Sequence, residues 1–324
     1  MQLRTQKEKI GQKYFLLNGI FVGSLLRPYL FLGLVLNTFF GCQSVPHETR
    51  APAIVNGQVT ELAKNSGLVL QIIEGEKHSR CSASFVDLGF QNVIVTAAHC
   101  LWAVDQKKAR ANVFRVKTED NKVYLEKIGS IVDQAIRKGY QAKDRNIEDP
   151  YDLALGLLDQ DIPSDMKKLS LPVQSWLPRN AEAMRLMGAG LTILEFELDK
   201  TSAMMRTALI QGEYLVRRGT LFGSLWDLVS SSGFKEGDTL TIRKPQDKGP
   251  YLCPGDSGGA LIAEENGNHT IVGVISTENQ ISYYGRKVCW YPVNLVPVSA
   301  HLKWLKDTAQ ELVELQARKK SKSL

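Results

Sequence analysis

The sequence lacks three features that would assign it to common functional classes. Its five histidines show no metal-ligand spacing with one another or with carboxylates, so we predict neither a metal site nor a cofactor. Its net charge of +6 comes mainly from the two chain ends, and a body close to neutral predicts no nucleic-acid surface. Its amino-terminal apolar stretch is interrupted at Arg27-Pro28, which disfavours a membrane-spanning helix of about 20 residues.

What remains is the composition of a globular protein. Hydrophobic residues make up 44% and charged residues 23% of the chain, ordinary values for a protein that buries one large core or two small ones. Cysteine is scarce, with five residues, and most of these cysteines need partners or a separate explanation. They are Cys42, Cys81, Cys100, Cys253 and Cys289.

The first part of the chain is typical of an export signal. Residues 1–13 are polar and basic, and the apolar run 29–41 leads directly into Cys42. A basic head, an apolar stretch of about 13 residues and a small residue before the signal-peptide cleavage site are the features of a secretory signal. Cys42 after Gly41 resembles a bacterial lipoprotein processing site, which implies a lipid on Cys42 and a membrane-attached protein of the cell envelope. Plain secretion and an uncleaved anchor are the alternatives.

Short β-prone runs separated by turn-prone or polar residues follow from residue 54 onward. This spacing predicts an all-β fold, although the pattern alone does not distinguish two barrels from one large sandwich. The runs of the first half are 67–73, 81–85, 92–96, 112–117, 122–128 and 152–158. The runs of the second half are 183–187, 207–210, 239–242, 260–263, 270–276 and 288–293.

One stretch, Gly255-Asp256-Ser257-Gly258-Gly259, contains the residue types that acyl transfer needs. Its glycines allow a sharp turn that can aim the amides of Gly255 and Ser257 at one point, where they would stabilise an oxyanion. A serine hydroxyl is a poor nucleophile unless a base accepts its proton. The chain should therefore also contain a histidine and an orienting carboxylate.

Both groups are present. His99, in Thr96-Ala97-Ala98-His99-Cys100, is the candidate base, and Asp152 is the candidate carboxylate that orients it. Asp144, Glu148 and Asp149 compete with Asp152, but only Asp152 is followed by an apolar strand that would bury it. The other histidines lie in linker, loop or helix contexts, and we predict that they are surface residues. They are His47, His78, His269 and His301.

These stretches resemble the chymotrypsin-like serine endopeptidases, in which histidine, aspartate and serine occur in this chain order. Ile54-Val55-Asn56-Gly57 is similar to the mature amino terminus of that family. The resemblance extends from residue 54 to the helix near residue 313. It implies two six-stranded antiparallel β-barrels with the site between them, followed by a C-terminal α-helix that packs on the second barrel.

The resemblance also implies a domain organisation. Residues 298–316 are expected to form the helix and Ser299 to cap it; the apolar residues that recur at helical spacing are Leu302, Leu305, Ala309, Leu312 and Leu315. A partner-binding helix is the alternative. The predicted parts are a signal peptide at 1–41, a linker or propeptide at 42–53, a protease domain at 54–316 with barrels at about 54–160 and 161–297, and a basic tail at 317–324. The stretches 118–149 and 194–243 are longer than the family predicts.

Two disulfides are implied by the resemblance. One joins Cys81 to Cys100 beside the candidate base, and the other joins Cys253 to Cys289 beside the specificity pocket. Two free buried thiols are the alternative for the second pair. Disulfides require an oxidising compartment, which agrees with export.

Activation by proteolysis is a further implication. In the family, a cut before Ile54 would free an α-amine that pairs with Asp256 and orders the oxyanion loop. Here Ala53 replaces the usual basic residue, and a trypsin-like activator would cut after Arg50 instead. An activating protease of another kind, or activation without a cut, is therefore expected. A simple strand start at Ile54 is the alternative.

Specificity is harder to predict. Tyr251 stands six positions before Ser257, at the base of the family's primary pocket, where trypsin-like members carry aspartate; cleavage after Lys or Arg is therefore not expected. Ser276 and Glu278 fall along the pocket wall, where Glu278 would narrow the entrance or add negative charge. The alternative is that insertions shift this correspondence.

We therefore expect an exported serine endopeptidase that hydrolyses protein or peptide substrates through an acyl-enzyme. Ser257 would be the nucleophile, His99 the base and Asp152 its orienting partner. A binding protein with a protease scaffold and a blocked pocket is the main alternative. A lipoprotein adhesin has no positive feature beyond the anchor.

Overall fold

The computed structural model describes residues 58–120, 122–141, 149–176, 183–190, 206–210, 215–218, 233–242, 252–283 and 286–322. All of them belong to one compact unit, Thr49–Leu324. For residues 122, 206–207, 209–210, 215–218, 277–283 and 286–292 the backbone path is described but the side chains are not. The predicted signal peptide, the lipidation site Cys42, the linker and the predicted amino terminus Ile54 lie outside the described residues.

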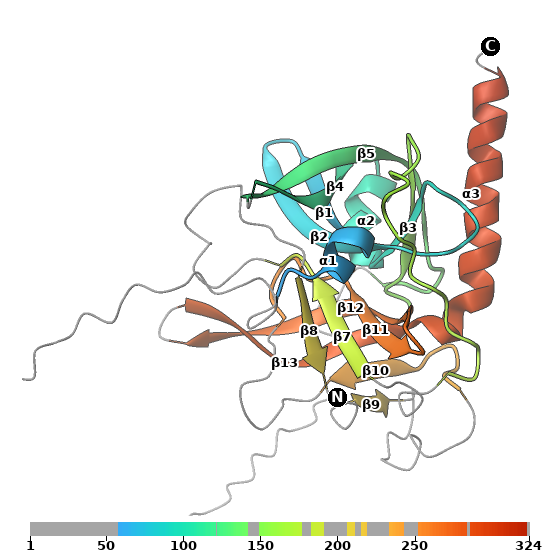
Figure 1. The fold of residues 1–324 in the computed structure, drawn as a ribbon. Coiled ribbons are helices and arrows are strands. Elements are labelled where there is room, and N and C mark those ends of the chain that lie inside the picture. Colours follow the sequence, from blue (N-terminus) through green and yellow to red (C-terminus); the bar gives the residue numbers. More distant parts are fainter. Residues whose placement is uncertain are drawn as a thin grey trace, which may run out of the picture. The chain divides into compact units, whose positions relative to one another are not determined.

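The first half of this unit is a closed antiparallel barrel of six strands, as predicted (Figure 1). In barrel order the strands are β1 (Gly67–Glu74), β2 (Lys77–Phe85), β3 (Val93–Thr96), β6 (Ala154–Leu158), β5 (Lys122–Ile136) and β4 (Arg110–Glu119). Every residue of β6 is buried, because the strand contacts its barrel neighbours and the helix α3 (Leu302–Lys322). Burial on both faces explains its continuous apolar sequence.

In the described residues, the second half forms a sheet of seven strands, one more than the six that we predicted. In sheet order the strands are β8 (Arg206–Ile210), β7 (Ala183–Gly188), β11 (Ala260–Glu265), β12 (Asn268–Tyr283), β13 (Arg286–Pro297), β10 (Thr239–Ile242) and β9 (Leu215–Arg218). The additional strand is β9, which pairs antiparallel with β10. Its sequence, two apolar residues followed by two arginines, shows neither alternation nor a continuous apolar run, so only the pairing partner identifies it.

Two short helices of the first half were not predicted. The helix α1 (Glu61–Ser66) begins after Thr60, whose hydroxyl accepts a hydrogen bond from the Ala63 amide at 3.2 Å. The helix α2 (Ala98–Asp105) follows β3 directly and contains His99 and Cys100. The residue before this helix, Ala97, offers no side chain that could cap it. The sequence therefore contained no residue that signals the start of a helix here, and we interpreted the motif only for its chemistry.

The C-terminal helix is longer than predicted and packs on the other half of the unit. A short 3-10 helix, η4 (Val298–His301), leads into α3 (Leu302–Lys322), so the predicted basic tail is helical up to Lys322. The most extensive contacts of α3 with the strands are those with β5 and β6 of the first barrel, whereas we predicted packing on the second barrel. Lys319 also pairs with Asp133 of β5 at 2.6 Å, and its positive charge near the helix end is favoured by the helix dipole.

Two residues near the start of α3 differ from the predictions. Ser299 lies inside η4 and is buried, so it does not cap the helix. His301 is also buried, with 2% of its surface exposed, because this turn of the chain faces Tyr151 and Arg137. The prediction of a surface histidine was therefore wrong at this position. Within the described ranges, no helix is long and apolar enough to cross a membrane.

Candidate active site

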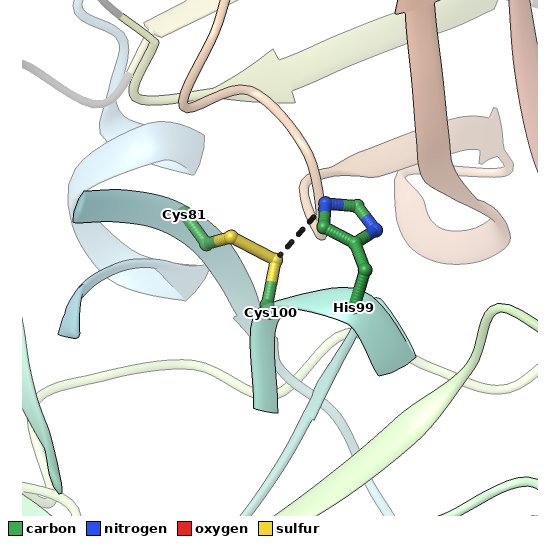
Figure 2. A group of neighbouring side chains, drawn as sticks. All are labelled: Cys81, His99 and Cys100. Carbon is green, nitrogen blue, oxygen red and sulfur yellow. Dashed lines mark hydrogen bonds between the residues drawn. A yellow bond between two sulfur atoms is a disulfide. The ribbon is translucent and has the colours of Figure 1, made fainter. Parts of the chain in front are cut away.

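The helix α2 and the strand β2 are joined beside His99. Cys100 of α2 forms a disulfide with Cys81 of β2 (Figure 2). A bridge over 19 residues stabilises the fold by about 3 kcal/mol in the chain-entropy model. It also fixes the turn of α2 that presents His99.

The two sulfur atoms and the His99 ring lie as close together as the ligands of a metal ion would. One ligand atom from each of Cys81, His99 and Cys100 lies within 4.8 Å of the others. Metal-binding cysteines coordinate as thiolates, whereas both sulfurs here are consumed by the disulfide. This cluster therefore fixes a histidine and does not hold an ion in the oxidised protein.

Asp152 holds His99 at two points. The carboxylate oxygen Oδ1 accepts a hydrogen bond from the His99 main-chain amide at 2.9 Å. The other oxygen, Oδ2, lies 2.8 Å from the ring nitrogen Nδ1. A carboxylate at Nδ1 places the proton on that nitrogen and leaves Nε2 able to act as a base.

Ser276 of β12 supports this carboxylate from the second half of the unit. Its hydroxyl donates a hydrogen bond to Asp152 Oδ2 at 2.6 Å. Burial favours a raised pKa for Asp152, but the attraction of His99 and the hydrogen bonds from His99 and Ser276 outweigh it, and the pKa lies below the usual 3.8. The side chain of Ser276 thus contacts Asp152. We had predicted Ser276 only as a residue of the pocket wall and had not predicted this contact.

The competing carboxylates lie elsewhere or outside the described residues. Asp149 accepts hydrogen bonds from the amides of Gln141 at 2.9 Å and Tyr151 at 2.8 Å. Burial raises the pKa of Asp149, and the nearby Asp152 charge adds to this effect. Asp149 therefore organises the loop before β6, whereas Asp152 contacts the imidazole. Asp144 and Glu148 lie in residues 142–148, which are not described.

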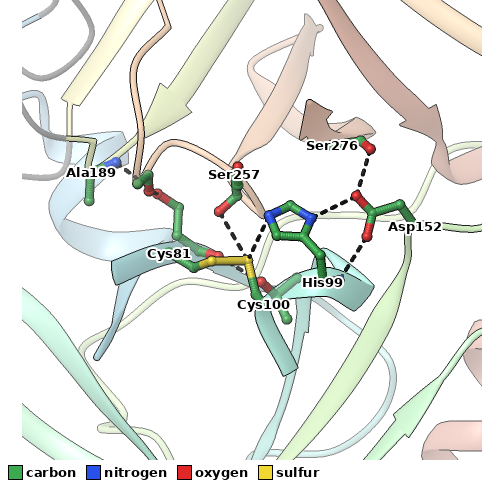
Figure 3. Close-up of a disulfide and its surroundings, with 10 residues drawn as sticks. Cys81, His99, Cys100, Asp152, Ala189, Ser257 and Ser276 are labelled. Atoms are coloured by element: carbon green, nitrogen blue, oxygen red, sulfur yellow. Dashed lines mark hydrogen bonds and ion pairs between the residues drawn. A yellow bond between two sulfur atoms is a disulfide. The ribbon is translucent and has the colours of Figure 1, made fainter. Parts of the chain in front are cut away.

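Ser257 lies on the opposite side of the His99 ring from Asp152 (Figure 3). It is largely buried, with 7% of its surface exposed, and it belongs to the loop that precedes β11. The Cys100 sulfur lies 3.6 Å from both His99 Nε2 and the Ser257 carbonyl oxygen. Because a disulfide sulfur has no hydrogen to donate, and Nε2 carries none when the proton is on Nδ1, these contacts are packing contacts.

The loop around Ser257 has a conformation that requires glycine at two positions. Gly255 has φ +101° and Gly258 has φ +82°, values that L-residues with side chains rarely adopt. A Cβ atom at Gly258 would lie 2.1 Å from the Thr96 hydroxyl and 2.2 Å from the Ser82 carbonyl oxygen. The close approach of the first barrel therefore excludes any side chain beside the candidate nucleophile.

Asp256 is fully buried, with none of its surface exposed. Its Oδ1 accepts a hydrogen bond from the Gly190 amide at 2.7 Å, and Oδ2 accepts one from the Cys253 amide at 2.8 Å. Cβ atoms built on Gly188 and Gly190 would lie only 2.4 Å and 2.6 Å from atoms of this carboxyl group. Glycines at the end of β7 therefore make room for the buried carboxylate.

Several predicted site residues lie outside the described part of the chain. Neither the backbone nor the side chain of Ile54 and Tyr251 is described. For Glu278 and Cys289 only the backbone is described. Cys253 is disulfide-bonded, but its pairing with Cys289 stays a prediction. The pocket residues and the Ile54–Asp256 pair also stay predictions.

Comparison with known proteins adds an independent finding. A family model described as Trypsin matches residues 54–305. The chain is 26% identical over 272 residues to a protein of Canis lupus familiaris called chymotrypsin-like elastase family member 1, covering 82% of this chain and 95% of that protein. It is 28% identical over 297 residues to the protein of the same name from Macaca fascicularis, covering 88% of this chain and 98% of that protein.

Proposed function

Because this chain belongs to the trypsin family of serine proteases, we propose that it is an endopeptidase that hydrolyses peptide bonds through an acyl-enzyme. The main support is the contact of His99 with the buried Asp152, with Ser257 on the far side of the ring. The residues come from both halves of the unit: His99 and Asp152 from the first barrel, and Ser257 from the loop before β11. Such an arrangement of base and orienting carboxylate activates a serine hydroxyl.

In the acylation step, His99 Nε2 accepts the proton of the Ser257 hydroxyl while Oγ forms a bond to the substrate carbonyl carbon. Asp152 stabilises the positive charge that this transfer gives to the imidazole. The resulting oxyanion accepts hydrogen bonds from the amides of Gly255 and Ser257. The protonated His99 then gives its proton to the leaving amine, the C–N bond breaks, and the acyl group stays on Ser257.

Deacylation repeats these steps with water. His99 accepts a proton from the water molecule, whose oxygen attacks the acyl carbon, and the same amides stabilise the second oxyanion. The proton then returns to Ser257 Oγ as the acyl bond breaks. No other group takes part in these steps.

We propose that the substrates are proteins or peptides cleaved after residues that are neither lysine nor arginine. Tyr251, at the predicted base of the primary pocket, supplies no negative charge for a basic side chain. The two relatives are called elastases, and a preference for uncharged side chains is consistent with that name. Digestion of a peptide library by the processed protein, with Ser257→Ala as the control, tests this proposal; frequent cleavage after basic residues would contradict it.

Export is proposed from the amino-terminal sequence together with the Cys81–Cys100 disulfide. Attachment to a membrane would depend on a lipid on Cys42, and activation would depend on a free amine at Ile54 that pairs with Asp256. Mass spectrometry of protein purified from membranes and from the medium distinguishes these possibilities. A mature protein that begins at Met1 in both fractions would contradict the lipid on Cys42 and the free amine at Ile54, whereas protein found only inside the cells would contradict export.

Labelling with a fluorophosphonate tests the central proposal. This reagent modifies only a serine whose hydroxyl is activated, so protein that begins at Ile54 should form an adduct at Ser257. Ser257→Ala should abolish the labelling, whereas Ser164→Ala, at an exposed serine, should not change it. An unlabelled, folded wild-type protein would reject the endopeptidase and favour the binding protein with a protease scaffold.

A further inference from the structure

Ser82 occupies an unusual position between the two halves of the unit. It follows the disulfide residue Cys81 on β2, and none of its surface is exposed. A buried hydroxyl and a buried peptide group are costly unless each donor and acceptor has a partner. All the polar groups of Ser82 have such partners, and two of these partners lie on the loop of the candidate nucleophile.

Two hydrogen bonds connect Ser82 directly to that loop. Its main-chain amide donates to the Ser257 carbonyl oxygen at 2.7 Å. Its hydroxyl donates to the Gly255 carbonyl oxygen, also at 2.7 Å. These carbonyls stand on either side of Asp256, so one residue of the first barrel holds the loop at two successive points.

The same hydroxyl also accepts a hydrogen bond. The donor is the amide of Ala189, after the end of β7, at 2.8 Å. Figure 3 shows Ala189 on the side of Ser257 that is away from Asp152. The next amide along the chain, that of Gly190, donates to Asp256 Oδ1 at 2.7 Å. Two consecutive amides thus hold Ser82 and Asp256, the two side chains that support the loop.

The position of Ser82 is itself fixed. Its carbonyl oxygen accepts a hydrogen bond from the Thr96 hydroxyl of β3 at 2.7 Å. The neighbouring Cys81 is tied to α2 by the disulfide. Because Ser82 can move little, the peptide groups that it binds are also restrained.

We propose that Ser82 is a positioning residue for the oxyanion amides, a role that rests on the proposed function. A peptide group is planar, so the hydrogen bond to the Gly255 carbonyl sets the plane of the Gly255–Asp256 peptide. Gly255 has φ +101°, a conformation in which glycine keeps several alternatives open. The Gly255 amide belongs to the preceding Pro254–Gly255 peptide, which is joined to this plane through the φ and ψ of Gly255. By holding the plane, the Ser82 hydroxyl selects one conformation of Gly255 and thereby directs its amide toward the substrate carbonyl.

Ser84 provides a matched control on the same strand. It is also fully buried, but its hydroxyl has no hydrogen-bond partner. Both Ser82→Ala and Ser84→Ala remove one buried oxygen from β2. Only the first removes hydrogen bonds to the loop, so a difference between the variants reports those bonds rather than the loss of a hydroxyl.

The kinetic experiment compares both variants with the wild-type protein on one peptide substrate. Removing a direct oxyanion donor costs about 10²–10³-fold in kcat, and loss of its orientation should cost less, so we expect Ser82→Ala to lower kcat about 10-fold with an unchanged KM. A peptide boronic acid, whose adduct is tetrahedral, should bind about 10-fold more weakly, while the corresponding product peptide binds equally well. Ser84→Ala should match the wild type in every respect.

Amide hydrogen exchange supplies a measurement that does not depend on turnover. In the Ser82→Ala protein the Ala189 amide loses its acceptor and should exchange faster, while urea unfolding confirms that the fold is retained. If the active wild type and Ser82→Ala have equal kcat and boronate affinity, the positioning role is rejected although the proposed function stands. If the wild type neither hydrolyses peptides nor binds boronate, the proposed function fails, and with it the positioning role; the exchange rates then test only the hydrogen bonds.

Discussion

The carboxylate of Asp152 uses both of its oxygens to hold His99. One accepts the main-chain amide at 2.9 Å and the other lies 2.8 Å from Nδ1. The first contact fixes the start of α2, and the second fixes the rotation of the ring. Backbone and side chain of the candidate base are therefore positioned by one buried group, which concentrates the effect of mutations at Asp152.

Asp152→Asn should lower kcat by about 10³–10⁴-fold, because an amide that donates to Nδ1 leaves the proton on the wrong ring nitrogen. Asp149→Asn is the matched control, since Asp149 accepts backbone amides of Gln141 and Tyr151. It should retain activity within a few-fold. Steady-state kinetics with both variants check the expectation; equal losses would show that His99 is oriented by something else.

Ser276→Ala should reduce both activity and resistance to acid. The lost hydrogen bond to a buried carboxylate is worth about 1.5–3 kcal/mol. Because the folded-state pKa of Asp152 is lowered, its stabilisation is present above pH 3.8 and is lost as the pH falls through the folded-state value. The variant's pKa should rise, so acid unfolding should begin at a higher pH.

Circular dichroism during acid titration measures this shift. Ser299→Ala is the control, because the Ser299 hydroxyl is buried without a hydrogen-bond partner and its removal should be nearly neutral. An identical acid midpoint for Ser276→Ala and the wild type would contradict the predicted contribution of this hydrogen bond.

Gly258→Ala should destabilise the protein by about 3 kcal/mol and abolish activity, because its Cβ would overlap Thr96 and Ser82. Gly267→Ala tests the backbone strain alone. Gly267 has a similar φ of +75°, but nothing lies within 4 Å of a Cβ there, so it should cost only about 1–2 kcal/mol. The free energies of unfolding of the two variants in urea separate steric overlap from backbone strain. Equal losses of stability would show that the loop around Gly258 moves to relieve the overlap.

His301 should make stability depend on pH. Burial, and then the charge of Arg137, lower its pKa from 6.5 to about 4, although Glu236 and the Pro150 carbonyl oppose this shift. As the pH falls from 6.5 toward 4, the unfolded chain gains a proton that the folded protein does not. The free energy of unfolding should therefore decrease across this window by about 3 kcal/mol.

Urea unfolding at pH 7, 5.5 and 4.5 tests the pH dependence. His301→Gln should remove most of the decrease, whereas His78→Gln, at an exposed histidine, should leave it intact. Arg137, Glu236, Lys303 and Asp307 line the same cavity as His301, so the comparison is made between variants that retain all four. If the free energy of unfolding of His301→Gln still decreases between pH 7 and 4.5 as in the wild type, the pH dependence comes from other groups.

The sequence alone determined twelve of the strands and the chain order of the candidate catalytic groups. Each of the twelve predicted β-prone runs overlaps a strand of the structure, because apolar side chains and turn residues act over a few neighbouring positions. The motifs around His99, Asp152 and Ser257 carried the family resemblance for the same reason. The Cys81–Cys100 bridge was likewise implied by the motif beside His99 and is present.

Only the tertiary structure decided which distant groups meet. The strand β9 needed its partner β10 to be identified, and α3 packed on the first barrel although its own apolar stripe fits either half. Ser276 reaches Asp152 across 124 positions, and Ser82 reaches Gly255 across 173. A local pattern shows that a hydroxyl will be buried, but its partner is set by how two sheets pack, and that information is spread over the whole chain.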